Sequence, residues 1–310
     1  MERHLEFDSR REISTLRRRQ HQMIQVDVFS SRPLEGNPLA VFTDGRGLSD
    51  GEMQALARET NLSETTFILP RDPATEQREG VRVRIFTVRE ELPFAGHPTL
   101  GTALVLRGAG SAPEVVLELG VGKVPVRFED RQAEPPFAEM TQVDPQFGPR
   151  HEREAVAKVT GVRSDDIDPG VPIQTVSTGL AFTIVPIRSL DVMRKLQVDQ
   201  GRAGEYLAHT GGKFFYFVCR ETVDPAARLH ARMPFYNGED PATGSAAGCA
   251  AAWMVANGVA EPDERALIEQ GLEAGRPSRI FVRASRAADR ITDVRVGGSG
   301  VVVMRGEVFL

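Results

Sequence analysis

The sequence predicts an α/β protein, more narrowly an α+β protein, built from two similar domains. Runs of alternating or continuous apolar residues, typical of strands, recur along the whole chain. Twice such strands lead into a loop with an acid, proline and glycine and then into small residues: ELPFAGHPTLGTALVL at 91–106 and EDPATGSAAGCAAAWM at 239–254. This weak internal duplication predicts a sheet wrapped around one buried helix in each domain, because an enclosed helix needs small and apolar residues on every side.

The composition and charge of the chain indicate which kinds of partner it binds and in which cell compartment it resides. The 310 residues suffice for one or two domains with a large core. A net charge of −5, from 38 basic and 43 acidic residues, argues against nucleic acid or an anionic membrane as partner. Cys219 and Cys249 have neither metal-site spacing nor a disulfide framework, which fits a reducing cytosol. We therefore expect a cytoplasmic protein.

The first 22 residues, MERHLEFDSRREISTLRRRQHQ, differ from the rest of the chain. They are highly charged and lack the apolar core of a signal peptide. We expect a flexible extension here, with the folded chain beginning at Met23.

The elements of the first half follow from local patterns. Residues 23–29 alternate apolar and polar side chains and predict a strand, and 39–44, 65–69 and 81–88 have the same character. Residues 49–60 predict a helix with Ser49 as its cap and Met53, Leu56 and Ala57 as its apolar face. After the loop around Gly96 a helix runs to 106, and paired strands follow at 115–119 and 123–128. Residues 134–136 interrupt the pattern like a linker.

The second half repeats this arrangement. Two short apolar runs flank Gly179 within 175–185, and residues 190–196 predict a helix. Strands are expected at 214–219 and 229–235, before the second small-residue helix. The tail contains strand-like runs at 280–282, 294–296 and 301–310.

Both loops end at a helix N-terminus, where free backbone N–H groups and the helix dipole attract anions. Gly96, Gly244 and Ser245 would let a ligand carboxylate approach the backbone closely. If the domains face each other, the two helix ends form one site for a small carboxylate. The alternative is two ordinary capped core helices.

Three residues are candidates for proton transfer. Glu64 lies between a helix and a strand and is followed by TTF, so apolar surroundings could raise its pKa and make it a general acid or base. The alternative is a surface glutamate. His97 could donate a hydrogen bond or shuttle a proton, or be a hydrogen-bonded loop histidine. Asp240 is either a helix cap or a second acid or base, and Glu239 is expected to be solvated.

Other catalytic chemistry lacks support in the sequence. Cys249 lies well past the first turn of its predicted helix, away from the position that activates a thiolate, so we expect a packed core cysteine. The chain contains no phosphate-binding loop, zinc-protease motif or nucleophile elbow.

Taken together, the motifs resemble the PhzF family of phenazine-biosynthesis-like proteins. The matching segments are DVF at 27–29, EGNPLAVF at 35–42, NLSETTF at 61–67, ELPFAGHPT at 91–99, STG at 177–179 and EDPATGSA at 239–246. The resemblance implies the diaminopimelate epimerase-like fold, with two pseudo-symmetric domains, each a curved, mostly antiparallel sheet around a central helix. It also implies a homodimer without metal or organic cofactor. We expect the first domain over 23–140, the second over 141–299, and a last strand at 300–310 that returns to the first.

The resemblance carries roles to individual positions. It implies Glu64 as the catalytic glutamate, assisted by His97 and Asp240, with the substrate bound by Asn37, Ser63, Gly244 and Ser245 beside Gly96. The implied reaction is a cofactor-independent isomerisation of a small cyclic carboxylate such as dihydro-hydroxyanthranilate. Two alternatives stay open: an epimerase- or racemase-type proton shift on another small amino or hydroxy acid, and a non-catalytic small-molecule binding protein on the same scaffold.

The sequence also differs from racemases that share this fold and, at two segments, from the family's usual pattern. Racemases of this fold use two opposing cysteines at the helix starts, whereas this chain has Gly96-His97 and Asp240-Pro241 there. We therefore favour isomerisation by a single carboxylate. Two segments depart from the family's usual pattern: TVRE at 87–90 and PFYNG at 234–238. Both border the expected cleft, so the identity of the substrate is left open.

Overall fold

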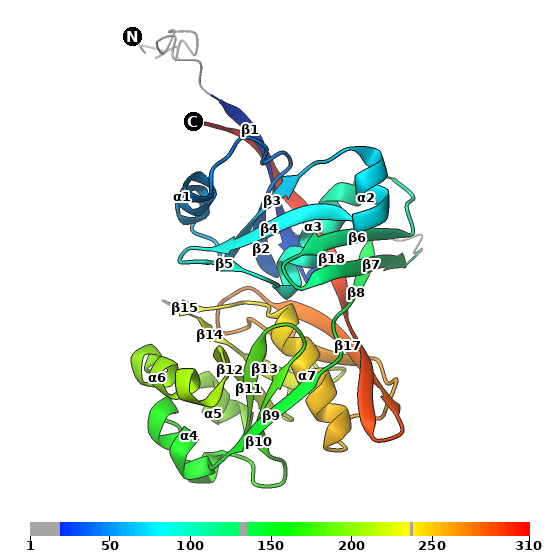
Figure 1. Cartoon of the computed structure of the whole chain (residues 1–310). Coiled ribbons are helices and arrows are strands. Elements are labelled where there is room, and N and C mark those ends of the chain that lie inside the picture. The colour runs from blue at the N-terminus through cyan, green and yellow to red at the C-terminus, as the bar shows by residue number, and fades with distance from the viewer. Residues whose placement is uncertain (1–18, 109, 130–134, 236–237) are drawn as a thin grey trace, which may run out of the picture.

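The structure is a computed structural model that describes residues 19–108, 110–129, 135–235 and 238–310. The chain forms two halves, stacked one on the other in Figure 1. Strand β18 (Arg290–Phe309) runs through both halves, because it pairs with β17 (Ser278–Ala287) in the second and with β1 (Gln20–Val28) in the first. Residues 1–18 of the expected extension and Glu134 of the expected interruption lie outside the described residues.

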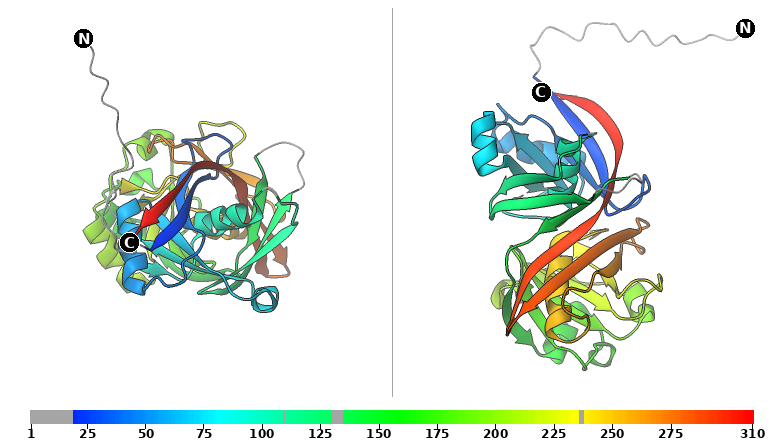
Figure 2. Two further views of the ribbon diagram at one scale, coloured as in Figure 1. Left: turned by 90° about the horizontal axis from the view of Figure 1, so that it is seen from above. Right: turned by 90° about the vertical axis from the view of Figure 1, so that its right-hand side faces the viewer.

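The first half is a curved sheet closed around one helix. Its neighbouring strands are, in order, β1, β2 (Asn37–Phe42), β3 (Glu64–Leu69), β4 (Val81–Thr87), β6 (Glu114–Leu119), β7 (Gly122–Glu129) and β8 (Phe137–Thr141). Strand β18 closes the ring by pairing with both β8 and β1. Helix α3 (Gly96–Arg107) contacts β1, β2, β6 and β18 and is enclosed by the strands in the view from above (Figure 2).

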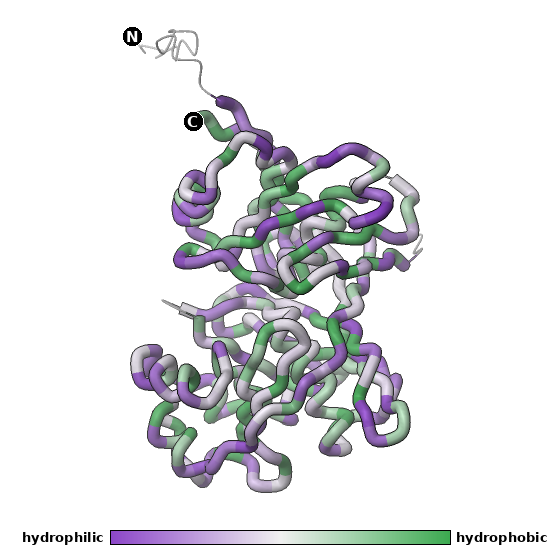
Figure 3. The backbone as a smooth tube through the Cα atoms, viewed as in Figure 1, coloured by the Kyte–Doolittle hydropathy of each residue, from purple (hydrophilic) through white to green (hydrophobic). Residues whose placement is uncertain are grey.

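The remaining elements of the first half cover the outside. Helix α1 (Asp50–Thr60) packs on β3 and β4, and the short strand β5 (Glu91–Leu92) pairs with β4. Helix α2 (Pro73–Glu79) contributes no buried residue and is mostly hydrophilic in Figure 3.

The second half is an open sheet with its own central helix. From β18 and β17 it continues through β16 (Ala266–Gln270), β13 (Leu229–Arg232), β12 (Phe214–Cys219), β11 (Ala181–Ile187), β10 (Ile173–Ser177) and β9 (Gln146–His151). Helix α7 (Gly244–Ala256) packs against β17, β18, β11 and β10. The outer helices are α4 (Arg153–Thr160), α5 (Leu190–Arg194) and α6 (Gln200–Thr210), with a 3-10 turn at Ser164–Asp166. Strands β14 (Pro234–Phe235) and β15 (Gly238–Glu239) form a small hairpin before α7.

The strand pairings confirm the internal duplication. In the first half β2 is parallel to β3 and β4 is parallel to β6, with α1 and α3 in the connections. In the second half β11 is parallel to β12 and β13 is parallel to β16, with α5, α6 and α7 in the connections. The other pairs along each sheet are antiparallel, so the predicted class and pseudo-symmetry are confirmed.

Enclosure of α7 explains its composition. Its residues from Gly244 to Val255 are all buried. Gly248 shows why small residues are required, because an added Cβ would lie 1.9 Å from the Gln142 side-chain oxygen. Trp253 nevertheless fits near the far end, where its indole N–H donates to the Pro172 carbonyl over 2.9 Å.

Local predictions succeed where a cap or an apolar face marks the element. Ser49 caps α1 in a reciprocal capping box with Glu52, as the sequence predicts.

The expected flexible extension is wrong for residues 20–22, because β1 begins at Gln20 and pairs with the end of β18. In the part of the chain that the structure describes, no helix combines the length and hydropathy needed to cross a bilayer.

Candidate active site

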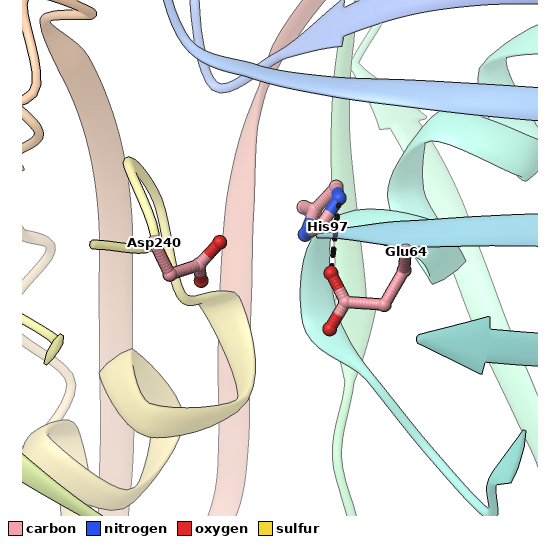
Figure 4. Close-up of side chains that lie close together, drawn as sticks. All are labelled: Glu64, His97 and Asp240. Atoms are coloured by element: carbon pink, nitrogen blue, oxygen red, sulfur yellow. Dashed lines mark ion pairs between the residues drawn. The ribbon is translucent and has the colours of Figure 1, made fainter. Parts of the chain in front are cut away.

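Glu64, His97 and Asp240 come together at the junction of the halves. Glu64 is the first residue of β3, His97 is the second residue of α3, and Asp240 lies between β15 and α7. Each offers a side-chain atom within 4.8 Å of the others, and all three residues are buried, with 6%, 2% and 2% exposure. Figure 4 shows Glu64 and His97 on one side and Asp240 facing them from the other half. The expected cluster is therefore present as a geometric unit.

Burial shifts the pKa of all three groups. It raises the pKa of Glu64 well above 4.5, and the nearby Asp240 carboxylate adds to this rise. It also raises the pKa of Asp240 to about 6, against hydrogen bonds from Thr243, Ser63 and Asn37 that lower it. The pKa of His97 falls to about 3 because burial disfavours the imidazolium. His97 is therefore neutral at pH 7, and its 3.6 Å approach to Glu64 is not a charge pair.

Asn37 links the two halves at this point. Its side-chain amide donates to Asp240 Oδ1 over 2.7 Å and to the Ala242 carbonyl over 2.9 Å, and lies 3.1 Å from His97 Nδ1. The amide nitrogen has two protons and no lone pair to offer, so its protons are shared among these three acceptors. A proton on Nδ1 of neutral His97 would point at this N–H group, which favours the tautomer with its proton on Nε2, the atom that faces Glu64 Oε2. Asn37 thus favours one tautomer of His97 and also holds Asp240.

Three polar atoms in the cluster have no hydrogen-bond partner among the described residues. They are Glu64 Oε2, His97 Nε2 and Asn37 Oδ1, and all are buried. Leaving a buried polar atom unpaired costs about 1–3 kcal/mol. Three such atoms at one point form a site that can offer hydrogen bonds to water or to a polar ligand.

The loop that carries Asp240 is fixed by side chains outside the predicted set. The Thr243 hydroxyl donates to Asp240 Oδ2 over 2.6 Å. The amide of Gln270, on β16, donates to the Asp240 carbonyl over 2.7 Å, while its oxygen accepts from the Thr243 backbone N–H over 3.1 Å. Tyr216 donates to the same Gln270 oxygen over 3.0 Å. Thr243 could have been identified from the sequence, because it lies within the EDPATGSA motif. For Gln270 the sequence signal is weak: it is a polar residue at the end of an apolar strand.

The N-termini of α3 and α7 lie against each other. A Cβ added to Gly96 would lie 2.3 Å from the Ser245 backbone nitrogen, and one added to Gly244 would lie 2.8 Å from the Phe29 ring. Neither Ala95 nor Thr243, the capping residues, makes a side-chain capping hydrogen bond. The glycines therefore allow two uncapped helix ends to meet, and both positive ends face the cluster of carboxyl groups.

Other candidates fall outside the cluster. Cys249 is the sixth residue of α7, fully buried beside the Thr178 hydroxyl at 3.3 Å, and burial raises its pKa to about 11. It is a protonated core thiol, as predicted. Glu239 corrects the expectation of a solvated side chain, because it pairs with buried Arg232.

Glu64, His97 and Asp240 are also the described residues that could hold a metal ion. Histidine with two carboxylates suits several divalent transition metals. Here both Asp240 oxygens already accept from Asn37 and Thr243, and the raised pKa values of the two acids favour protons over a cation. The arrangement fits proton transfer better than metal coordination.

Comparisons with known proteins agree with the motifs. The family model described as phenazine biosynthesis-like protein matches residues 26–306. A trans-2,3-dihydro-3-hydroxyanthranilate isomerase of Pseudomonas chlororaphis is 36% identical over 94% of this chain and 100% of its own. A solved structure of a predicted epimerase from Pseudomonas aeruginosa is 34% identical, with a TM-score of 0.80 over 93% of this chain and 99% of that chain. A Bacillus anthracis protein of the PhzF family is 27% identical, with a TM-score of 0.82 over 94% and 100%.

These relatives confirm the predicted family and its fold, and their names support an isomerase activity. The chain belongs to the PhzC-PhzF family of phenazine biosynthesis-like proteins.

Proposed function

We propose that this protein isomerises a small cyclic carboxylate of the dihydro-hydroxyanthranilate kind, using Glu64 as the proton-transfer group. The observation that carries the proposal is the buried Glu64 carboxyl group, which faces His97 and Asp240, has a raised pKa, and has one oxygen without a hydrogen-bond partner in the part of the chain that the structure describes. A raised pKa makes the carboxylate a stronger base and keeps its protonated form available as an acid near neutral pH. The same group can therefore remove a proton and return it.

The proposed reaction moves one proton within the substrate. The Glu64 carboxylate removes a proton from one ring carbon, the double bonds shift, and Glu64-H delivers the proton to another ring carbon. One C–H bond breaks and one forms, so nothing is oxidised or reduced. Neutral His97 donates from Nε2 to an oxygen of the reacting molecule, and Asp240 and Ser63 hold its polar substituents.

The substrate carboxylate is assigned to the two helix ends. Backbone N–H groups near Gly96, Gly244 and Ser245 would bind it, aided by both helix dipoles. Since these ends touch each other in this structure, the halves must separate slightly to admit the carboxylate. In the proposed reaction this contact corresponds to a closed arrangement, in which the site would exclude water during proton transfer.

A second candidate reaction is epimerisation, and the position of Asp240 favours it. Asp240 faces Glu64 from the opposite half, and its pKa is raised to about 6. Two acids on opposite sides of a substrate could remove and return a proton at the same carbon with inversion. The position at which solvent hydrogen enters the product distinguishes the two reactions.

The test is turnover in deuterated water. Wild type, Glu64→Gln and a surface control, Glu114→Gln, are assayed with trans-2,3-dihydro-3-hydroxyanthranilate, and product and deuterium position are followed by mass spectrometry and NMR. Product formation that is lost only in Glu64→Gln is expected, with deuterium at the new C–H position in those turnovers in which the Glu64 carboxyl proton exchanges with solvent before it is delivered. Label at a single inverted carbon would establish epimerisation, and binding with neither product nor exchange would establish a binding protein.

Assembly and location stay predictions. A homodimer should elute with twice the 34.0 kDa mass of the chain in size-exclusion chromatography with light scattering. The expected cytoplasmic location would be tested by fractionation of cells that express the full chain.

A further inference from the structure

Arg276 joins the second half to the loop that precedes Asn37. It lies in the connection between β16 and β17, and its side chain reaches the first half. Its Nε donates to the Gly36 carbonyl over 2.7 Å, and its Nη2 donates to the Glu35 carbonyl over 2.9 Å and to Asp27 Oδ1 over 2.8 Å. Because Asn37 directly follows Gly36, these hydrogen bonds fix the backbone at the point where the Asn37 side chain begins.

The loop between β1 and β2 depends on such support. Leu34 has a φ of 68°, a left-handed conformation that is unfavourable for any residue with a Cβ. Gly36 has a φ of 70°, and an added Cβ there would lie 2.3 Å from the Val28 carbonyl oxygen. The second oxygen of Asp27 holds the loop by accepting from the Leu34 backbone N–H over 2.6 Å. Backbone conformations of this kind persist only where the surrounding contacts hold them.

The loop that carries Arg276 also contacts the chain beside Asp240. Gly271 begins this loop with a φ of 80°, and an added Cβ would lie 2.4 Å from the Pro241 carbonyl oxygen. The preceding residue, Gln270, donates to the Asp240 carbonyl over 2.7 Å. The Arg276 backbone N–H donates to the Gly271 carbonyl over 2.9 Å, which closes the loop on itself. One loop therefore supports both partners of the hydrogen bond that joins the two halves.

The geometry at this position requires an arginine. Its planar guanidinium offers donors in fixed directions, and here they reach one carboxylate and two carbonyl groups. The Arg276 side chain is 26% exposed, and its partner Asp27 is buried, with 1% exposure. A lysine would keep the positive charge, but its single ammonium group cannot match three acceptors in this arrangement. Exchange of arginine for lysine therefore separates the effect of geometry from that of charge.

We propose that Arg276 is a positioning residue of the active site: it fixes the backbone before Asn37, and through Asn37 it sets the hydrogen bond to Asp240 across the junction. The inference rests on the proposed function, because the position of Asp240 matters to the chemistry only if Asp240 assists proton transfer. Since the Arg276 side chain bonds to residues 27, 35 and 36, its effect on Asp240 should pass through Asn37.

The test follows the titration of Asp240 directly and does not need turnover. The ¹³C resonance of its carboxyl group, assigned with Asp240→Asn, is recorded against pH in protein labelled at the aspartate carboxyl carbons. Wild type, Arg276→Lys, Asn37→Ala and the double variant Asn37→Ala/Arg276→Lys are compared. The titratable residues around Asp240 are kept in all of them: Glu64, His97 and Glu239.

The matched control is Arg283→Lys. Arg283 lies on β17, pairs with the Glu139 carboxylate over 3.0 Å, and has a side chain that is 34% exposed. Asp27→Asn is the second variant, because it weakens the same ion pair from the other side, and it replaces Arg276→Lys if that protein does not fold. Circular dichroism establishes folding for each variant.

The Asn37 hydrogen bond lowers the pKa of Asp240, so Arg276→Lys should raise this pKa from about 6 by about one pH unit. Asn37→Ala should raise it at least as far, and adding Arg276→Lys to Asn37→Ala should change it little further. Arg283→Lys should leave it unchanged. An unmoved titration in Arg276→Lys, an equal movement in Arg283→Lys, or full additivity with Asn37→Ala would overturn the inference.

Failure of the two proposals looks different. In an active enzyme Arg276→Lys should lower kcat/KM about fivefold at pH 6 and less than twofold at pH 8, because ionised Asp240 assists the reaction. If wild type forms product but Arg276→Lys leaves the Asp240 titration unmoved, the proposed reaction stands and the positioning role is refuted. If the titration moves as expected but wild type forms no product, the positioning of Asp240 stands and the reaction is refuted.

Discussion

The N-termini of α3 and α7 occupy equivalent places in the two halves but bring different chemistry to the junction. The first half contributes Glu64 and His97, both with buried atoms that lack a partner among the described residues. The second half contributes Asp240, whose two oxygens accept from Asn37 and Thr243. The two similar halves thus place Glu64 and His97, which have unpaired atoms among the described residues, opposite Asp240, which hydrogen bonds hold in place.

The same comparison explains why the fold does not imply thiol racemisation here. Equivalent helix starts would suit two equivalent bases, one on each face of a substrate. In this chain the positions differ, and the thiol of Cys249 is buried in the α7 core with its pKa raised to about 11. The difference teaches that the repeat determines where groups lie, whereas the residue at each helix start determines the reaction.

The largest expected effect comes from removing the base. Glu64→Gln should lower kcat by about 10³-fold, within the usual range for loss of a general acid or base. A matching loss in Glu114→Gln, a surface control, would contradict a specific role. If the activity of Glu64→Gln stays within threefold of wild type, Asp240 from the second half, and not Glu64 from the first half, would be the principal base.

The same substitution should stabilise the protein at alkaline pH. Glu64 has a raised pKa when folded, so the folded state binds its proton more tightly than the unfolded state, and stability falls as pH rises from about 4.5 through the folded pKa. Glu64→Gln removes this penalty. Thermal unfolding at pH 8 should occur about 2–4 °C higher than in wild type, with a smaller difference at pH 4. Equal differences at both pH values would contradict a raised pKa of the buried Glu64 carboxyl group.

Separating the helix ends should have the next largest effect. Gly96→Ala places a Cβ 2.3 Å from the Ser245 backbone nitrogen, which cannot move aside as a flexible side chain would. Overpacking of this kind costs about 1–3 kcal/mol, and we expect kcat/KM to fall at least tenfold. Gly51→Ala is the control, since no atom of the described residues, apart from its chain neighbours and its own helix backbone, lies within 4 Å of the added Cβ. Similar losses in both variants, by calorimetry and assay, would refute the contact between helix ends.

The fixed position of Asp240 is tested by Thr243→Val. The Thr243 hydroxyl lowers the Asp240 pKa, so its loss should raise that pKa above about 6. Because ionised Asp240 assists the proposed reaction, the acid limb of kcat/KM should move to higher pH, with about a tenfold loss of activity at pH 6. A uniform loss at every pH would indicate damage to the fold, and an unchanged profile would remove Asp240 from the reaction.

The smallest effects are expected from the thiol and from chelation. Cys249→Ala should keep kcat within about threefold, because a protonated core thiol takes no part in proton transfer. Activity after prolonged dialysis against EDTA should also equal that of untreated enzyme. Loss on chelation with recovery on Zn²⁺ addition would show that Glu64, His97 and Asp240 hold a metal.

Most elements could be predicted because they have local signals. Helix α1 has its cap and an apolar face, and β12 is a continuous apolar run whose residues are all buried. Helix α2 has a cap, since Asp72 accepts from the Thr75 N–H and Pro73 follows it, but it has no apolar face, because it contributes no buried residue and its polar sequence shows no helical stripe. The α6 segment includes Gly201 and Gly204, which weaken helix propensity, and its packing on β12 outweighs them.

The site could be predicted only as a set of residues. The motifs identify Glu64, His97 and Asp240, but nothing local shows that Asn37 joins Asp240 across 203 positions of the chain. Gln270 could not be predicted for the same reason, because its four hydrogen bonds with Asp240, Thr243 and Tyr216 exist only after the sheet has formed.

By itself the sequence determined the duplicated frame, the enclosed small-residue helices and the family, because each depends on residue size, periodicity or a contiguous motif. Only the tertiary structure decided which side chains share the junction, which buried atoms lack partners there, and how burial shifts three pKa values. Those properties depend on desolvation and on contacts between segments far apart in the chain, and both appear only when the two halves close on each other.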